Sequence, residues 1–503
     1  MQQRSIKFNT AMSFLGAIAR MAIPLVTTPY TSRILGPEGS GKIAFAFATT
    51  QWFSFAATAG LITYASREIA KVRHDRQNLC KTALEFSIIN SISVLTAWLL
   101  FLSYYAVSPR LQQEPTLMLV YGCGMLLCLF DCSWFFQGME DYRYITLRSL
   151  TAQILGAIGI FIFIHKPGDY VWVAWLTLIT GMLTAMANVR HFWRLLQPLP
   201  QVELSPARLL KPLSFTFVWF LLAAIHITAD VQIVGWLTND HTTGLYNAAS
   251  RLNKMTLALL TCMSGVLMPR ISNCLVAGKK EEYQRLGNLS FRFIWTFGLP
   301  AVAGIILLAP DLVQTLAGQR FAGAVPTMRL MAPLILIIAM RDFAAGNILY
   351  PNHRERWIFG FNLFSAATIP LLGFFLLPKS SLPAQAMAGI LLVVETINVL
   401  GLLYLASRMF PLDWLSRGNR FAILNTAVMM ATVWLLHQKL NCLWGSSDGQ
   451  HLTLHASIRL AVCATTGMAI YLSLLLVQRD PLIFGPLKPY LRRFRFPGAP
   501  SEL

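Results

Sequence analysis

The sequence has few charged residues for its length. Of its 503 residues, 13% are Asp, Glu, Lys or Arg, and 55% are hydrophobic, whereas soluble proteins carry about 25% charged residues. This scarcity excludes an ordinary water-soluble chain, and repeated apolar runs of about 20 residues indicate a polytopic membrane protein. The alternating pattern that a membrane β-barrel requires is missing from these runs, so we expect an all-helical fold.

Grouped cysteines and long loops are missing too. The eight cysteines are scattered, and Cys128 and Cys132 lack the spacing and histidine partners of a zinc site. We therefore expect no disulfide framework, no metal and no cofactor. The net charge of +19 lies mainly in short loops, where it orients a membrane protein, so we expect no nucleic-acid partner.

The apolar runs predict fourteen transmembrane helices. If the N-terminus is cytoplasmic, the inner segments hold about four times as many lysines and arginines as the outer loops, so we place both termini inside. The basic tail after Arg479 is expected to lie on anionic membrane lipids. The predicted spans are residues 9–31, 42–63, 82–107, 116–137, 144–164, 170–190, 213–236, 244–269, 288–310, 324–349, 357–377, 384–406, 420–437 and 457–478.

An internal repeat suggests how the spans are grouped. Gly41, with Ile43 and Ala46, resembles Gly244, with Tyr246 and Ala249, and each glycine lies at or next to the start of an even-numbered span. Six spans per repeat give two halves of the same topology with an interior between them. The expected domains are an N-terminal lobe (1–200), a C-terminal lobe (201–410) and a last pair of spans with the tail (411–503).

Several charges lie inside the predicted spans. Arg20 lies within the first span, and Arg251 and Lys254 share one face of the eighth. A charge near the bilayer centre costs roughly 2.5–3.5 kcal/mol and marks a binding site or pathway by default. Arginine suits phosphate because its planar fork bonds two oxygens at once. We predict an anion site formed by these three residues, with further basic residues at the mouths of the cavity: Arg33, Arg67 and Arg270.

Embedded acidic residues are candidates for ion coupling. His226 and Asp230 lie on one face of the seventh span and would form a proton-sensitive pair. Two structural alternatives stay open. Asp230 would pair with Arg251 or Lys254 and lock the two helices together, or His226 would bond a backbone carbonyl. Glu395 and Asp131 are the remaining candidates.

Four stretches resemble the Wzx-type O-antigen and polysaccharide flippases. Residues 28–39 resemble the first-loop signature of that family, and residues 131–142 resemble its Trp-Phe-x-Gln-Gly-x-Glu loop. Residues 268–272 and 308–311 are also similar to the family. The family belongs to the multidrug/oligosaccharidyl-lipid/polysaccharide exporter superfamily.

The resemblance implies a fold, a substrate and partners. The fold would be two six-helix lobes in a V that work by alternating access in the bacterial inner membrane. The substrate would be an undecaprenyl-pyrophosphate-linked oligosaccharide, moved from the cytoplasmic to the periplasmic leaflet with H+ or Na+ coupling. A polysaccharide polymerase and a chain-length regulator are implied partners. The cytoplasmic loop motif comprises Trp134, Gln137, Gly138, Glu140 and Asp141.

The acidic pair of this motif has two structural interpretations. Glu140 and Asp141 would cap the next helix or pair with Arg143 and Arg148, and we favour a structural latch.

Three other functions compete with this prediction. A multidrug or cation antiporter of the same fold would favour an acidic, aromatic interior, whereas three of the deepest charges here are cations. A lipid II flippase is a second relative. A membrane polysaccharide polymerase or glycosyltransferase would need a large extracytoplasmic loop with catalytic side chains, and the outer loops here are short. We therefore expect a transporter and not an enzyme.

Overall fold

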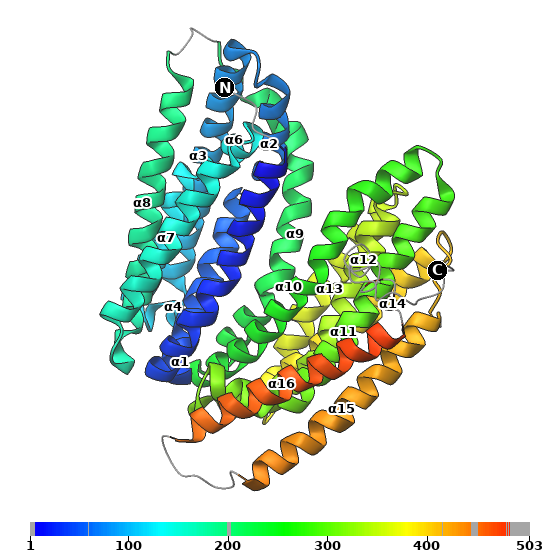
Figure 1. Ribbon diagram of the computed structural model, residues 1–503. Coiled ribbons are helices and arrows are strands. Elements are labelled where there is room, and N and C mark those ends of the chain that lie inside the picture. Colours follow the sequence, from blue (N-terminus) through cyan, green and yellow to red (C-terminus); the bar gives the residue numbers. More distant parts are fainter. Residues whose placement is uncertain are drawn as a thin grey trace. The chain divides into compact units, whose positions relative to one another are not determined.

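The computed structural model describes residues 6–58, 60–198, 203–414, 416–443, 451–478, 480 and 482. These residues form helices joined by short turns, with no strand among them (Figure 1). The all-helical prediction is confirmed. The helices are α1 (Ile6–Thr58), α2 (Leu61–Val72), α3 (Arg76–Val107), α4 (Pro109–Gln112), α5 (Pro115–Met125), α6 (Ser133–Gly138), α7 (Tyr142–Phe163), α8 (Tyr170–Leu196), α9 (Ala207–Leu237), α10 (Asp240–Val276), α11 (Lys280–Leu316), α12 (Ala324–Phe343), α13 (Glu355–Leu376), α14 (Pro383–Ser407), α15 (Arg417–Leu443) and α16 (His451–Val477).

Ten helical stretches within the described ranges are long and apolar enough to cross a membrane. They coincide with predicted spans three to six and nine to fourteen. The other four predicted spans fall on α1, α9 and α10, so the total of fourteen and the orientation of the termini stay predictions. A multi-pass membrane protein is nevertheless established by these ten stretches.

Three of the predicted spans differ from the apolar pattern: the first two are joined in one helix, and the fourth is divided. The expected loop after the first span is helical on both sides of Gly36, whose φ of 69° and ψ of −177° kink α1. Only glycine adopts this backbone region without strain. The fourth span is divided into α5, a 3₁₀ turn (Leu126–Phe130) and the short helix α6.

The chain forms two compact units. The first comprises residues 1–248, 316–321 and 362–390, and the second comprises 249–315, 322–361 and 391–503, in each case as far as the chain is described. The predicted division at residues 200 and 410 stays a prediction. In the first unit, α1 packs against α3, α7 and α9. In the second, α11, α15 and α16 share an apolar core that includes Leu308, Val433 and Cys463.

The start of α10 crosses α1 at two glycines. A Cβ on Gly41 would lie 1.8 Å from the Asp240 carbonyl oxygen, and a Cβ on Gly244 would lie 1.9 Å from the Pro37 carbonyl oxygen. Each glycine thus faces the carbonyl four residues before the other glycine. This reciprocal arrangement is what a two-fold repeat produces, and it places the glycine pair of the sequence repeat in direct contact.

The segment that leads into α9 is attached to α3. Glu85 is fully buried and accepts hydrogen bonds from the Ser205 N–H at 2.8 Å and from Arg208 Nε and Nη2 at 3.0 and 2.7 Å. Arg76 donates to the Leu196 carbonyl at 3.3 Å, where α8 ends. The described parts of this connection are therefore fixed to α3 at both ends, because both oxygens of the buried Glu85 carboxylate accept hydrogen bonds from it, two of them from a charged arginine.

We predict that Gly41→Ala destabilises the protein by about 1–3 kcal/mol, because the new methyl group must push α1 and α10 apart. Thermal unfolding in detergent, followed by tryptophan fluorescence, measures the change. Gly389→Ala on α14 is the control, since a Cβ at this position would have nothing within 4 Å of it and alanine favours a helix. Equal melting temperatures for Gly41→Ala and wild type would contradict the close crossing.

We predict that Glu85→Gln destabilises the protein by about 1.5–3 kcal/mol, because it removes the charge from a buried acceptor of two arginine hydrogen bonds. The same thermal assay measures the loss. Glu68→Gln is the matched control, since Glu68 pairs with Lys71 on an accessible surface at 2.7 Å and such pairs contribute little. If both variants lost the same amount, Glu85 would not anchor the connection.

Candidate functional site

The structure describes five of the six basic residues predicted to bind phosphate. Arg251 and Lys254 both have exposed side chains on α10, and so does Arg270 further along the same helix. The exposed Arg33 side chain on α1 packs beside Gly318, where a Cβ would lie 3.2 Å from Arg33 Cγ. Arg67 on α2 lies over the Tyr64 ring at 5.4 Å.

The predicted anion site is therefore described only in part. The side chains of Arg20 and His226 lie outside the described residues. The role of the six basic residues in binding a phosphate stays a proposal.

The acidic candidates for ion coupling have different surroundings. Asp230 is 3% exposed and accepts a hydrogen bond from the Tyr246 hydroxyl at 3.1 Å. Glu395 is 1% exposed and pairs with Arg341 Nη1 at 3.0 Å, and Arg341 also pairs with Asp342 at 3.0 Å.

Asp131 has a local role in the backbone. It accepts a hydrogen bond from the Ser133 N–H at 3.1 Å, at the start of α6. Its carboxylate therefore stabilises the beginning of the short helix that carries the Trp-Phe motif.

The motif around Trp134 forms a packed junction between α2 and α6. Trp134 is buried against Phe86 and Phe192, with ring centroids 5.7 and 6.2 Å away. A Cβ on Gly138 would lie 2.6 Å from Ile69 Cγ2, so only glycine allows the two helices to approach this closely. Gln137 is half-buried beside it.

The acidic pair of this motif makes structural contacts. Asp141 accepts a hydrogen bond from the Tyr144 N–H at 3.4 Å, which caps α7, and pairs with His191 at 3.1 Å. Glu140 lies at a positive φ of 58° and pairs with Arg73 at 2.7 Å. Glu140 therefore pairs with Arg73, and Asp141 caps α7 and contacts His191, in place of the expected pairs with Arg143 and Arg148.

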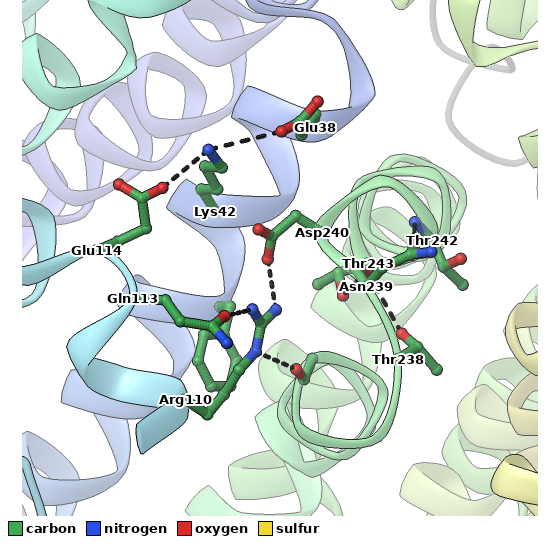
Figure 2. A network of polar contacts seen from close by, with 12 residues as sticks. Glu38, Lys42, Arg110, Gln113, Glu114, Thr238, Asn239, Asp240, Thr242 and Thr243 are labelled. Atoms are coloured by element: carbon green, nitrogen blue, oxygen red, sulfur yellow. Dashed lines mark hydrogen bonds and ion pairs between the residues drawn. The ribbon is translucent and has the colours of Figure 1, made fainter. Parts of the chain in front are cut away.

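A polar network surrounds the α1–α10 crossing (Figure 2). Arg110 on α4 pairs with Asp240 in the first turn of α10 at 2.5 Å and donates from Nε to the Gly235 carbonyl at 3.2 Å. Its guanidinium carbon lies 5.1 Å from the centroid of the Phe45 ring. One arginine thus holds the end of α9, the start of α10 and a ring of α1 together.

A second group of charges lies beside Arg110. Lys42 pairs with Glu114 at 2.8 Å and with Glu38 at 3.6 Å, and the Tyr170 hydroxyl donates to Glu114 at 2.6 Å (Figure 2 shows both lysine pairs). Burial raises the pKa of Glu114, but the hydrogen bonds from Lys42 and Tyr170 outweigh it, so this pKa lies below its ordinary value. Glu114 therefore keeps its charge well below neutral pH.

Local sequence signals place these charges at the ends of helices. Asn239 caps α10 by accepting the Thr242 N–H at 2.8 Å, and Asp240 then complements the positive end of the helix dipole. Pro115 begins α5 directly after Glu114.

Sequence reasoning missed this network. The signal that could have found it was the repeated glycine pair, because a close crossing at the ends of helices brings the neighbouring loops together. The arrangement can hold α1 and the start of α10 together through ion pairs and through the close backbone contact at the two glycines. Among the described residues, no group of three or more His, Cys, Asp or Glu side chains could hold a metal ion.

These features define a helical multi-pass membrane protein, and comparisons with known proteins identify its family. A family profile described as polysaccharide biosynthesis protein matches residues 6–275. A second profile, described as lipid II flippase MurJ, matches residues 151–478. The chain belongs to the polysaccharide biosynthesis protein family and shares its later spans with the lipid II flippases. The predicted Wzx-type relationship is confirmed.

Individual relatives agree with this assignment. The chain is 24% identical over 395 residues to a candidate O-antigen transporter of Escherichia coli (strain K12), which covers 77% of this chain and 92% of that protein. Its fold is similar to that of the lipid II flippase MurJ in an inward closed conformation, with a TM-score of 0.69, 14% identity and coverage of 95% and 99% of the two chains.

An inward-facing multidrug resistance MATE family transporter of the MOP superfamily matches with a TM-score of 0.63, 15% identity and coverage of 78% and 98%. The prediction of a transporter rather than an enzyme is confirmed by the family and these relatives. The protein is a flippase of the lipid-linked polysaccharide class.

We predict that Arg110 and Asp240 are energetically coupled. A double-mutant cycle with Arg110→Ala and Asp240→Ala should give a coupling free energy of about 1 kcal/mol in thermal unfolding, since the pair is partly buried. The exposed pair of Lys71 and Glu68 is the control and should give about 0.3 kcal/mol. If the effects of the two alanine substitutions are additive, the Arg110–Asp240 pair does not stabilise the crossing of α1 and α10.

Proposed function

We propose that this protein moves undecaprenyl-pyrophosphate-linked oligosaccharide repeat units from the cytoplasmic to the periplasmic leaflet of the bacterial inner membrane. Transport would follow alternating access and draw on an H+ or Na+ gradient. A polysaccharide polymerase would take up the product, and a chain-length regulator would act with that enzyme. The substrate class is consistent with the family and with the relative that is described as an O-antigen transporter.

The observation that carries the proposal is the exposure of Arg251 and Lys254 on α10. Because the predicted span 244–269 contains both residues, their charges must face something other than lipid. A diphosphate offers the oxygen acceptors that a guanidinium and an ammonium group bind with charge-assisted hydrogen bonds. Arg20, Arg33, Arg67 and Arg270 would add positive charge along the path of the substrate.

The α1–α10 crossing would act as the extracytoplasmic closure. In the predicted orientation, Lys42, Arg110 and Asp240 lie at the outer ends of their helices. Release of a glycan on that side requires the Arg110–Asp240 pair to separate and the backbones at Gly41 and Gly244 to part. A partly buried ion pair suits this task, because it holds the crossing closed at a modest free energy and water can solvate both partners once they separate.

Ion coupling would involve the embedded acidic residues. Asp230 and Glu395 are buried carboxylates in apolar helices, and His226 lies one turn before Asp230. The hydroxyl of Tyr246 and the guanidinium of Arg341 keep the two carboxylates hydrogen-bonded in the arrangement described here. A cation that competes for either carboxylate would change these contacts, which is the requirement for coupling. Asp131, which bonds its own loop, is the weakest of the four candidates.

We predict that Arg251→Gln and Lys254→Gln each slow flipping of a pyrophosphate-linked polyprenyl oligosaccharide in proteoliposomes by about tenfold or more. The physical reason is the loss of a charge-assisted hydrogen bond, which contributes about 1.5–3 kcal/mol. Arg20→Ala should behave in the same way. Arg356→Gln, an exposed arginine in the first turn of α13, is the matched control and should flip at the wild-type rate.

Each other outcome of this assay has a definite meaning. If the folded Arg251 and Lys254 variants flip normally, the anion site lies elsewhere. If wild type moves organic cations but no pyrophosphate-linked lipid, the multidrug antiporter is the better assignment. If wild type prefers lipid II over longer glycans, the protein is a lipid II flippase.

A further inference from the structure

A closed ring of four polar side chains joins α11, α15 and α16. Asp311 on α11 is 1% exposed and lies under the other three. Arg459 Nε on α16 donates to both carboxylate oxygens of Asp311, at 2.9 and 3.0 Å. His437 Nε2 on α15 lies 2.9 Å from Asp311 Oδ2. Asn441, one turn after His437, closes the ring: its Oδ1 accepts from Arg459 Nη1, and its Nδ2 lies 3.2 Å from His437 Nδ1.

The ring fixes the protonation state of His437. Arg459 has only donors, so Asn441 must present its oxygen to Arg459 and its NH₂ group to His437. His437 Nδ1 must then accept that hydrogen bond and carries no proton. His437 Nε2 faces a carboxylate that is paired with arginine, so Nε2 carries the proton and donates. The four bonds close only around a neutral histidine.

We propose that this ring is a proton-binding site, in which a proton taken up at His437 Nδ1 breaks the bond between Asn441 and Arg459 and loosens α16 from α15. With the proton bound, Nδ1 becomes a donor and opposes the NH₂ group of Asn441. Rotation of that amide satisfies His437 but turns its NH₂ group toward Arg459, where two donors again meet.

The net charge of the ring also favours its opening when His437 is protonated. Before protonation, Asp311 and Arg459 neutralise each other at the edge of an apolar core that includes Leu308 and Val433, with the Asp311 carboxylate on its buried side. After protonation, two cations share a single carboxylate, and one positive charge is left over. A net charge beside a buried carboxylate in apolar surroundings is unfavourable, so protonation favours movement of Arg459, in the first half of α16, toward water.

The neighbouring titratable groups do not replace His437 in this role. On α16, His455 lies one turn before Arg459, and Cys463 lies one turn after it and is fully buried. On α15, Lys439 is exposed two residues after His437. His437 bonds Asp311 directly, and histidine is the side-chain type that ordinarily changes charge between pH 5 and 8.

In transport, the ring would sense protons on the side to which the glycan is delivered. In the predicted orientation, the end of α11, the end of α15 and the start of α16 face the periplasm, where the proton concentration is higher. This part of the inference rests on the proposed flippase function and names the proton as a coupling ion. The ring itself is testable without any transport.

The first experiment measures alkylation of Cys463 by N-ethylmaleimide in the full-length protein in detergent, with mass spectrometry to resolve the peptide that contains Cys463. Rates are divided by those of His437→Gln at the same pH, which removes the effect of pH on the thiol itself. Glutamine keeps a donor toward Asp311 and does not titrate. We expect this ratio to rise about fivefold or more between pH 8 and pH 5.5, with a midpoint in the range of a histidine.

Two further variants make the result decisive. Asn441→Asp should abolish the rise, because a carboxylate accepts from both protonated His437 and Arg459 and keeps the ring closed in acid. His165→Gln, an exposed histidine in the first unit, is the matched control and should respond as wild type does. Melting curves establish that each variant is folded. A ratio that stays flat with pH overturns the proton site, and so does an Asn441→Asp variant that still opens in acid.

The transport arm varies the pH on one side of proteoliposomes while lipid-linked oligosaccharide is flipped. We expect wild type to respond to the pH at the end that carries the ring and His437→Gln to lose that response. If the wild-type protein flips the lipid-linked oligosaccharide but His437→Gln keeps the same pH response, the ring does not couple proton binding to transport. If wild type does not flip at all, the proposed function fails, and the alkylation result still decides the ring.

Discussion

The close approach of two backbones at Gly41 and Gly244 is the contact on which the rest of the first unit depends. Because neither residue carries a side chain, the start of α10 lies directly on α1, and the loops on either side of the crossing come within reach of one another. Arg110 can then bond the end of α9 and the start of α10 at once. Larger residues at either glycine would separate these partners.

The second theme is how an apolar helical protein carries charge. Glu85, Asp311 and Glu395 are all nearly fully buried, and each pairs with an arginine from another helix. Such pairs fix the register of helices whose apolar surfaces alone would allow sliding. Arg251 and Lys254 lie at exposed positions of α10 instead. We propose that these two cations bind the phosphates of the substrate.

The sequence predicted most of the membrane-crossing helices, but neither their kinks nor the partners of their charged side chains. Apolar length predicted spans three to six and nine to fourteen, since a helix that crosses lipid must be apolar for most of its length. The same criterion missed the kink at Gly36 and the 3₁₀ turn that divides the fourth span, because backbone geometry leaves little trace in hydropathy. The acidic pair in the Trp134 loop was correctly assigned to the loop, but its partners Arg73 and His191 come from segments far away in sequence.

The sequence by itself determined the all-helical membrane class, the family and the presence of cations inside spans, because each of these depends on composition or on short contiguous motifs. The tertiary structure decided which charges meet. Arg110 with Asp240, Glu85 with Arg208, and the ring of Asp311, His437, Asn441 and Arg459 join residues from different helices. No local pattern encodes such pairs, because the packing of helices determines which side chains come within hydrogen-bonding distance.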